Sequence, residues 1–396
     1  MADYPELLRR RLDEILSSSQ DEMLRSAIAR IYLRHLLELT TPQEWERPEE
    51  AVWVRGREQI VLHCFRLGIC CAVAAQHSGP DRQSFRWGEL ISMSETLITK
   101  FEQTDLTEER HVWVSETSQI VANYFAGNTS AREALRLLFP NAGSRSDWRS
   151  SAVEDLSSID FKDSVAEDVF DLQNDIRFHS PEDALRQELF SPENESEFTS
   201  KPHYVTIYFE HGLSSAGEVW TFWSDWYNGF LEGKPLDWKL QERVALIDDA
   251  IWSAGPDAVA EEIAKIKVEM ALENFRGIHA GNRTTRHGVG GNYPPEAIED
   301  PKDLVSSMDL VWKAIGDIED EVAKPTPDRG SLEIALGALK SGLTALLRWS
   351  GHKADLALDT AIKWSILVVG GTYLAAHPDK VQALIEAVEG WLKFIP

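Results

Sequence analysis

Apolar residues recur three and four positions apart along most of this chain, and that spacing constrains the fold more than any other feature. The repeat is clear in residues 22–39, 57–76, 118–127 and 381–395. Side chains at this spacing share one face of a helix with 3.6 residues per turn. Proline and glycine interrupt the pattern at intervals, as they do at helix ends. We therefore predict an all-α fold of multi-helix bundles joined by a Gly-rich hinge, with at most one short strand.

Shifts in composition divide the chain into four segments. Residues 151–200 contain fourteen Asp and Glu residues against three Lys and Arg residues, which predicts a helix followed by an acidic, solvated loop. The predicted segments are an N-terminal helical bundle at 1–145, an acidic segment with an aromatic helical module at 146–276, a basic Gly-rich linker at 277–296 and a C-terminal helical unit at 297–396.

The linker is predicted from residues 277–296, which are rich in glycine and lack apolar periodicity. Arg283 and Arg286, together with the preceding Arg276, make it a positive spot on a negative chain. Binding of these arginines to an anionic ligand or to the chain's own acidic segment is the alternative interpretation.

Residues 220–230, with the sequence WTFWSDWYNGF, hold three tryptophans, a tyrosine and two phenylalanines. On a helix the aromatic side chains occupy one half of the circumference and the polar side chains the other. No Lys or Arg interleaves with them, as it would on a base-stacking surface. We predict that this helix buries its aromatic face, and that Trp252 caps that face before Gly255 and Pro256 begin a new helix.

Residues 203–212, with the sequence HYVTIYFEHG, concentrate β-branched and aromatic side chains. This composition is typical of a strand, and it is the one credible strand in the sequence. A single strand leaves its backbone groups without a partner, so extension of a helix is the alternative.

The charge balance narrows the range of partners. With 65 Asp and Glu residues against 40 Lys and Arg residues, the formal net charge is −25. Phosphate binding depends on clustered basic residues, so this charge argues against DNA or RNA as a partner and against simple adsorption to anionic membranes.

Cys64, Cys70 and Cys71 lie among apolar neighbours, which predicts buried free thiols. No secretory signal is visible at the N-terminus, and we expect a cytoplasmic protein.

The C-terminal helix predicted at residues 381–395 has a strictly one-sided apolar pattern. We hypothesise that this face pairs with another copy or another protein. The residues proposed to make that contact are Leu384, Val388, Trp391 and Leu392.

Residues 364–378, WSILVVGGTYLAAHP, carry no formal charge. As a helix they would cover about 22 Å, which is short of the roughly 30 Å hydrocarbon core of a bilayer. A buried core helix is the favoured interpretation, and a membrane-active segment is the alternative.

Known catalytic motifs are scarce in the sequence. It contains no HExxH pattern, no zinc-type spacing of Cys and His and no phosphate loop, so we predict neither cofactor nor metal. Arg57 and His63 resemble the R-x4-6-H pattern of the helical HEPN ribonucleases, and Arg30 and His35 do so too. In such enzymes the cation would stabilise a phosphate while His transfers a proton.

A wider resemblance starts at the aromatic segment. The pattern W-x-x-W-Y … W-x-x-G-P is carried by Trp223, Trp226, Tyr227, Leu231, Gly233, Pro235, Trp252, Gly255, Pro256, Val259 and Ile263. It resembles a group of Ala- and Asp-rich helical proteins of alphaproteobacteria, although Ala260 stands where asparagine is common. Residues 288–296, GVGGNYPPE, resemble a GxGHNxPPE tag of those bacteria, with Gly291 in place of histidine. The resemblance implies a recurring helical module at residues 200–275 and no catalytic residue.

The sequence favours a non-enzymatic helical protein that serves in protein interaction or assembly and forms oligomers. Its support is the one-sided C-terminal pattern together with the lack of a strong catalytic motif. One alternative is a membrane-perturbing effector of the toxin or phage-defence type, acting through residues 364–378. The other is a HEPN-like ribonuclease using Arg57 and His63.

Overall fold

The protein is all-α wherever its structure is described. The computed structural model describes residues 13–17, 19–40, 58–76, 108–125, 128–138, 178, 180–189, 213, 216–284, 302–352 and 377–396. These residues are 83% helical and form 13 helices and no strand. The predicted all-α fold is therefore confirmed for this part of the chain. The ambiguous strand at 203–212 and most of residues 151–200 lie outside the described residues.

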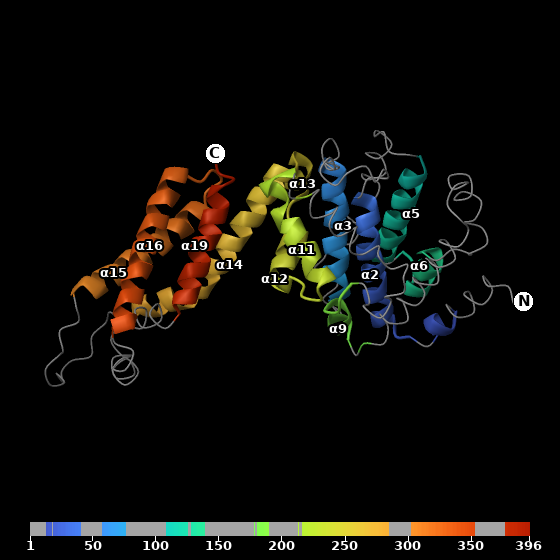
Figure 1. The fold of residues 1–396 in the computed structure, drawn as a ribbon, viewed down its shortest axis with the longest axis horizontal. Helices are drawn as coiled ribbons and strands as arrows, with labels where there is room; N and C mark the ends of the chain where they lie inside the picture. Colours follow the sequence, from blue (N-terminus) through green and yellow to red (C-terminus); the bar gives the residue numbers. More distant parts are fainter. Residues whose placement is uncertain are drawn as a thin grey trace, which may run out of the picture. The chain divides into compact units, whose positions relative to one another are not determined.

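The chain divides into two compact units, Met1–Pro256 and Asp257–Pro396 (Figure 1). The helices of the first unit are α2 (Asp21–Thr40), α3 (Glu58–Gln76), α5 (Glu108–Phe125), α6 (Ala131–Leu138), α9 (Pro181–Leu185), η4 (Glu218–Trp220), α11 (Thr221–Leu231), α12 (Trp238–Ala245) and α13 (Asp249–Ala254). The helices of the second unit are α14 (Pro256–Thr284), which begins one residue before the boundary, α15 (Lys302–Val322), α16 (Arg329–His352) and α19 (Pro378–Leu392).

Helix α3 is the centre of the first unit. It packs against α2, α5, α9 and α12, and every residue from Ile60 to Ala75 is buried. Among the described helices it alone is long and apolar enough to cross a membrane, but 89% of its apolar window is covered by the protein itself. In this structure α3 is a core helix.

The aromatic face of α11 packs on α3. Phe65 stacks on Trp223 at a centroid distance of 5.1 Å and meets the edge of Trp226 at 6.0 Å. Trp252 lies 5.9 Å from Trp223 and is fully buried. The predicted burial of the aromatic face and its capping by Trp252 are confirmed, as is the start of a new helix at Pro256.

Three buried polar tips of this aromatic cluster have a partner inside the protein. Trp226 Nε1 donates to Gln241 Oε1 at 2.8 Å, and Trp252 Nε1 donates to the Ile247 carbonyl at 3.1 Å. The Tyr227 hydroxyl donates to the Leu33 carbonyl at 3.0 Å. Because buried polar groups cost free energy unless they are hydrogen-bonded, these three bonds stabilise the packed aromatic core.

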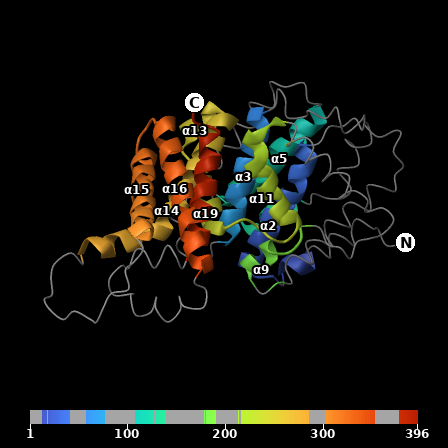
Figure 2. The ribbon, with the colours of Figure 1, turned by 60° about the vertical axis from the view of Figure 1, so that its left-hand side comes forward.

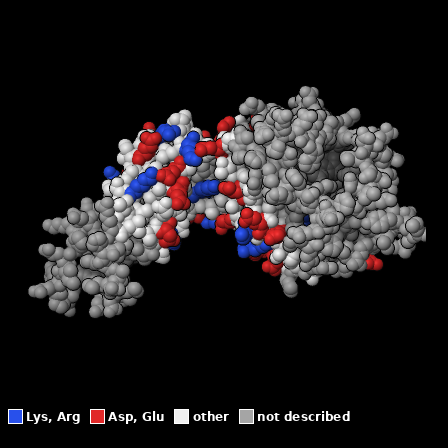
Figure 3. Space-filling view, viewed as in Figure 1, with Lys and Arg blue, Asp and Glu red and all other residues white. Residues whose placement is uncertain are grey.

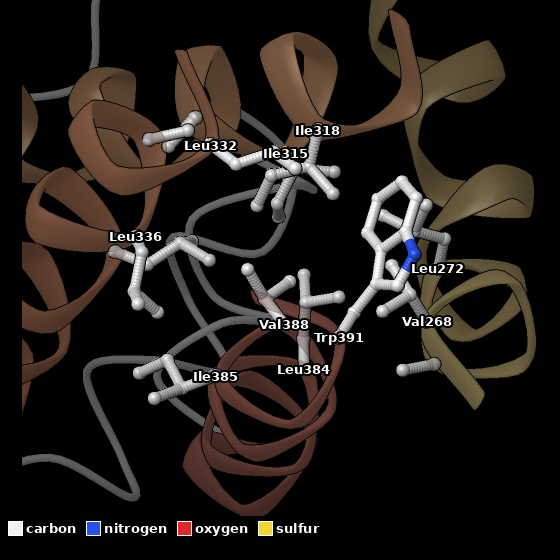
Figure 4. Close-up of a cluster of buried hydrophobic side chains, with 14 of the residues drawn as sticks. Val268, Leu272, Ile315, Ile318, Leu332, Leu336, Leu384, Ile385, Val388 and Trp391 are labelled. Carbon is white, nitrogen blue, oxygen red and sulfur yellow. The ribbon is translucent and has the colours of Figure 1, made fainter. Parts of the chain in front are cut away.

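The second unit is a bundle whose helices share one hydrophobic core. Helix α16 packs against both α15 and α19, and the three lie side by side in two views (Figures 1 and 2). Figure 4 shows side chains of α19 pointing toward α15 and α16, and Trp391 pointing toward Val268 and Leu272 of α14.

Charged side chains fix the helix ends of the second unit. Glu321, which is buried, accepts from Lys324 Nζ at 2.5 Å and from the Asp328 amide at 2.9 Å. Hydrogen bonding from Lys324 holds the pKa of Glu321 below its usual value. Arg329 Nη1 donates to the Leu392 and Ile395 carbonyls at 3.0 and 2.6 Å, and so caps the C-terminal end of α19.

Two features differ from the division expected from sequence. The N-terminal helices and the aromatic module, which the sequence placed on either side of residue 145, share one core in the first unit. Residues 277–284, the start of the predicted linker, continue α14 as helix. An established helix adds each further residue at low cost, so glycine and arginine at its end do not stop it. Residues 285–296 of that linker lie outside the described residues.

Gly233 closes the turn after α11 in a conformation that a side chain would strain. Its φ is +66°, and an added Cβ would lie 2.8 Å from both the Arg186 carbonyl oxygen and the Glu188 amide nitrogen. We expect Gly233→Ala to lower the free energy of unfolding by about 1–3 kcal/mol, measured by chemical denaturation. Gly390→Ala is the control, because a Cβ there meets nothing within 4 Å, and it should stabilise α19 by roughly 0.5–1 kcal/mol. Equal effects of the two changes would contradict this account.

Candidate functional site

Two buried arginines of α2 hold the segment that contains α9. Arg30 donates from Nη1 to the Ala184 and Gln187 carbonyls and from Nη2 to the Glu188 and Leu189 carbonyls, at 2.7–3.3 Å. Arg34 Nε donates to the Leu189 carbonyl at 2.9 Å. These guanidinium groups satisfy carbonyls at the end of a short helix, which is a structural role.

A third buried arginine, Arg66 on α3, binds side chains of α13. Its Nη2 pairs with Asp249 Oδ1, and its guanidinium lies 4.9 Å from the centroid of Trp252. Arg66 is 5% exposed, whereas the Asp249 side chain is 59% exposed. The aromatic face and the carboxylate together stabilise the cation, so Arg66 fixes α13 onto α3.

Of the four residues proposed for ribonuclease chemistry, the structure describes the side chains of Arg30 and His63. His63 lies inside α3 and is 4% exposed, so its ring does not reach solvent in this conformation. Arg57 lies outside the described residues. In the second pair, Arg30 is engaged with backbone carbonyls, and the side chain of His35 is outside the described part. The ribonuclease hypothesis stays a prediction without structural support.

The predicted burial of the three cysteines is confirmed. Burial raises the pKa of the Cys64 thiol from an ordinary 9.0 to about 12, and it raises the pKa of Cys71 and of Tyr32 well above their usual values. All three groups are therefore neutral at physiological pH. A protonated, buried thiol is a poor nucleophile and a poor metal ligand.

The face of α19 proposed for partner binding is occupied within the second unit. Leu384, Val388, Trp391 and Leu392 are 0–7% exposed and belong to its hydrophobic core. Figure 4 shows the first three of them in that core. The one-sided pattern is confirmed, but it is covered by α14, α15 and α16 of the same chain. A one-sided helix needs an apolar neighbour, and here the neighbour is intramolecular.

An exposed apolar side chain does occur on the opposite surface of α16. Its buried residues line one side of the helix, namely Leu332, Ala335, Leu336, Leu339 and Leu343. Ile334 points away from them and is 77% exposed. We define the outer face of α16 as the exposed residues between 333 and 344, namely Glu333, Ile334, Gly337, Lys340, Ser341 and Thr344. Leu347, which is 50% exposed, lies one turn beyond it.

Small residues lie next to Ile334 on the outer face of α16. A Cβ added to Gly337 would meet nothing within 4 Å, and Ser341 and Thr344 follow at one-turn spacing. Glycine inside a helix costs roughly 0.5–1 kcal/mol relative to alanine. Gly316 and Gly390 are open as well, but neither has an exposed large apolar residue three or four positions away. Of these three glycines, only Gly337 has both an open backbone and an exposed large apolar side chain, that of Ile334, one turn away.

Charges of both signs flank this surface. Glu333 pairs with Arg329 at 3.0 Å, and Lys340 pairs with Glu389 at 2.5 Å, and all four side chains are about half exposed. Basic and acidic side chains also intermix over the second unit in the view of Figure 3. Exposed pairs of this kind contribute little to stability, so these groups can exchange partners.

No group of three or more His, Cys, Asp or Glu residues that could hold a metal occurs in the described part of the chain. Residues 364–376 of the proposed membrane-active segment lie outside it. Comparison of the sequence and structure with family models, curated proteins and solved structures finds no match. The outer face of α16 is therefore the candidate site, on geometry alone.

We expect Arg30→Lys to destabilise the first unit strongly. An ammonium group cannot reach the four carbonyls that the guanidinium serves, and buried carbonyls without a donor each cost about 1–3 kcal/mol. The urea midpoint should fall by the equivalent of roughly 2–4 kcal/mol. Arg186→Lys, at an exposed pair with Glu182, is the control and should stay within about 0.5 kcal/mol. A urea midpoint unchanged by Arg30→Lys would show that the hydrogen bonds of Arg30 to these carbonyls contribute little to stability.

The buried thiols predict a loss of stability in alkaline solution. Above pH 9 an unfolded chain releases the Cys64 proton, whereas the folded chain retains it to about pH 12. The unfolded state is thereby favoured, and the free energy of unfolding should fall between about pH 9 and 12 by up to roughly 1.4 kcal/mol per pH unit for this thiol. Denaturation curves over this range would measure the fall. It should be shallower in Cys64→Ala, and an identical slope would refute the assignment.

Proposed function

We propose that this chain is a non-enzymatic helical protein whose C-terminal unit binds another protein surface through the outer face of α16. The observation that carries the proposal is Ile334, which is 77% exposed on a helix whose other face is packed in a complete core. The neighbouring Gly337 leaves the helix backbone open to close approach, and the small residues Ser341 and Thr344 follow it on the same face.

The energetics of Ile334 support a binding role. Full burial of an isoleucine side chain contributes about 1.5–3 kcal/mol, and this contribution is unused while the side chain faces water. A single exposed apolar residue is common on protein surfaces. Its position above a stripe of small residues is what favours helix-to-helix docking, because ridges on one helix pack into grooves on another.

The residues that the sequence offered for catalysis give no competing support. Arg30 is bound to carbonyls of the first unit and His63 is buried, whereas Arg57 and the side chain of His35 lie outside the described residues. The interaction class therefore remains the best supported, with the surface moved from α19 to α16.

Ile334→Asp tests the proposal in the cell that makes this protein. The wild-type chain should migrate on size exclusion of native cell extract above the position of a 44.7 kDa monomer, and Ile334→Asp should shift it toward the monomer. A charge in place of the apolar side chain removes the docking contact, while its exposed position leaves the fold unchanged.

Leu310→Asp is the matched control, because Leu310 is an exposed apolar residue of α15 outside the candidate surface. It should leave migration of the complex unchanged. Equal migration of wild type and Ile334→Asp, or an equal shift with Leu310→Asp, would contradict the proposed role of the α16 surface.

A further inference from the structure

We infer that the surface bound by the outer face of α16 is the same face of a second copy, crossing antiparallel at Gly337. This inference rests on the proposed function and names its partner. The side chains along this face of α16 are ordered so that the face complements itself when it is reversed.

The outer face of α16 carries two parallel stripes. Ile334 and Ser341 are seven residues apart, so they lie about 20° apart around the helix, and the same holds for Glu333 and Lys340. Gly337 lies between the two stripes, half-way along each. One stripe therefore holds a protruding apolar residue and a small one, and the other holds a negative and a positive charge.

A two-fold axis that passes between the two copies at the level of Gly337, perpendicular to α16 and parallel to its outer face, brings complementary residues together. Such an axis keeps each stripe on its own side and reverses its direction, as an isologous contact requires. Ile334 then lies over Ser341 of the second copy, and Glu333 lies beside its Lys340. The two Gly337 residues meet at the crossing point, where the open backbone permits close approach.

The charges of Glu333 and Lys340 favour an antiparallel pair of helices over a parallel pair. A two-fold axis along parallel helices would instead lay the charged stripe of each copy over the Ile334 and Ser341 stripe of the other, so Glu333 and Lys340 would meet no opposite charge. The intrachain partners Arg329 and Glu389 are about half exposed in their pairs, so sharing these charges with a second copy costs little. Charge complementarity therefore supplies the direction of the pair.

The size of this contact sets the expected strength. One helix-to-helix crossing buries less surface than the roughly 1,200 Å² of a standard stable interface. We expect a reversible dimer with a dissociation constant on the order of micromolar or weaker. Purified full-length protein should therefore change mass with concentration.

Charge reversal tests the arrangement. In light scattering of the purified full chain, Glu333→Lys alone or Lys340→Glu alone should weaken self-association roughly ten-fold, because each dimer contains two opposed pairs. An equimolar mixture of the two variants should recover wild-type association, since every contact in the mixed dimer again joins opposite charges. Asp317→Lys, the same charge change on the exposed side of α15, is the control and should associate as wild type.

The outcomes separate this inference from the proposed function. Recovery on mixing supports the antiparallel second copy. Wild-type association of both single variants, or no recovery on mixing, overturns it. A purified wild type that stays at 44.7 kDa at every concentration also overturns it. The proposed function survives that result if Ile334→Asp still shifts the protein in native extract, and it falls if the extract shows no shift either.

Discussion

Burial of large aromatic rings between α3 and α11 is the interaction on which the first unit depends. Phe65 lies within 6.4 Å of three tryptophans, and Trp252 joins the same cluster from α13. Aromatic side chains bury the largest areas of any residue, and offset or edge contacts add to that stabilisation. The arginines of α2 and α3 then attach α9 and α13 to this core. Arg30, which resembles a catalytic group in the sequence, thereby serves the fold.

Burial of apolar faces also decides where a docking surface can lie in the second unit. The apolar faces of α14, α15, α16 and α19 meet in one core, so the most regular pattern in the sequence is already used within the chain. What remains for a partner is a surface of mixed character, with one protruding isoleucine, an open glycine backbone and two charges. Weak and reversible association follows from a surface of that kind.

The sequence predicts the helices of α2, α3, α11, α14 and α19 because a single period decides each of them. It does not predict which helices share a core, since Phe65 and Trp223 are far apart in sequence and their contact depends on tertiary packing. The face of α19 is correctly predicted as apolar, but periodicity cannot tell an internal neighbour from another chain. The spacing of Gly337 and Ser341 can be read from the sequence. The structure is needed to show that Ile334 beside them is exposed, and so that this face of α16 is a candidate docking surface.

The central claim is that the face of α19 is core and that the outer face of α16 is the docking surface. Maleimide labelling of Ile334→Cys and Val388→Cys measures both, because the three native thiols are buried. The account predicts that the cysteine at 334 reacts rapidly in dilute protein and slowly in concentrated protein, whereas the cysteine at 388 is protected in both. Rapid labelling at 388, or a rate at 334 that does not change with concentration, would contradict it.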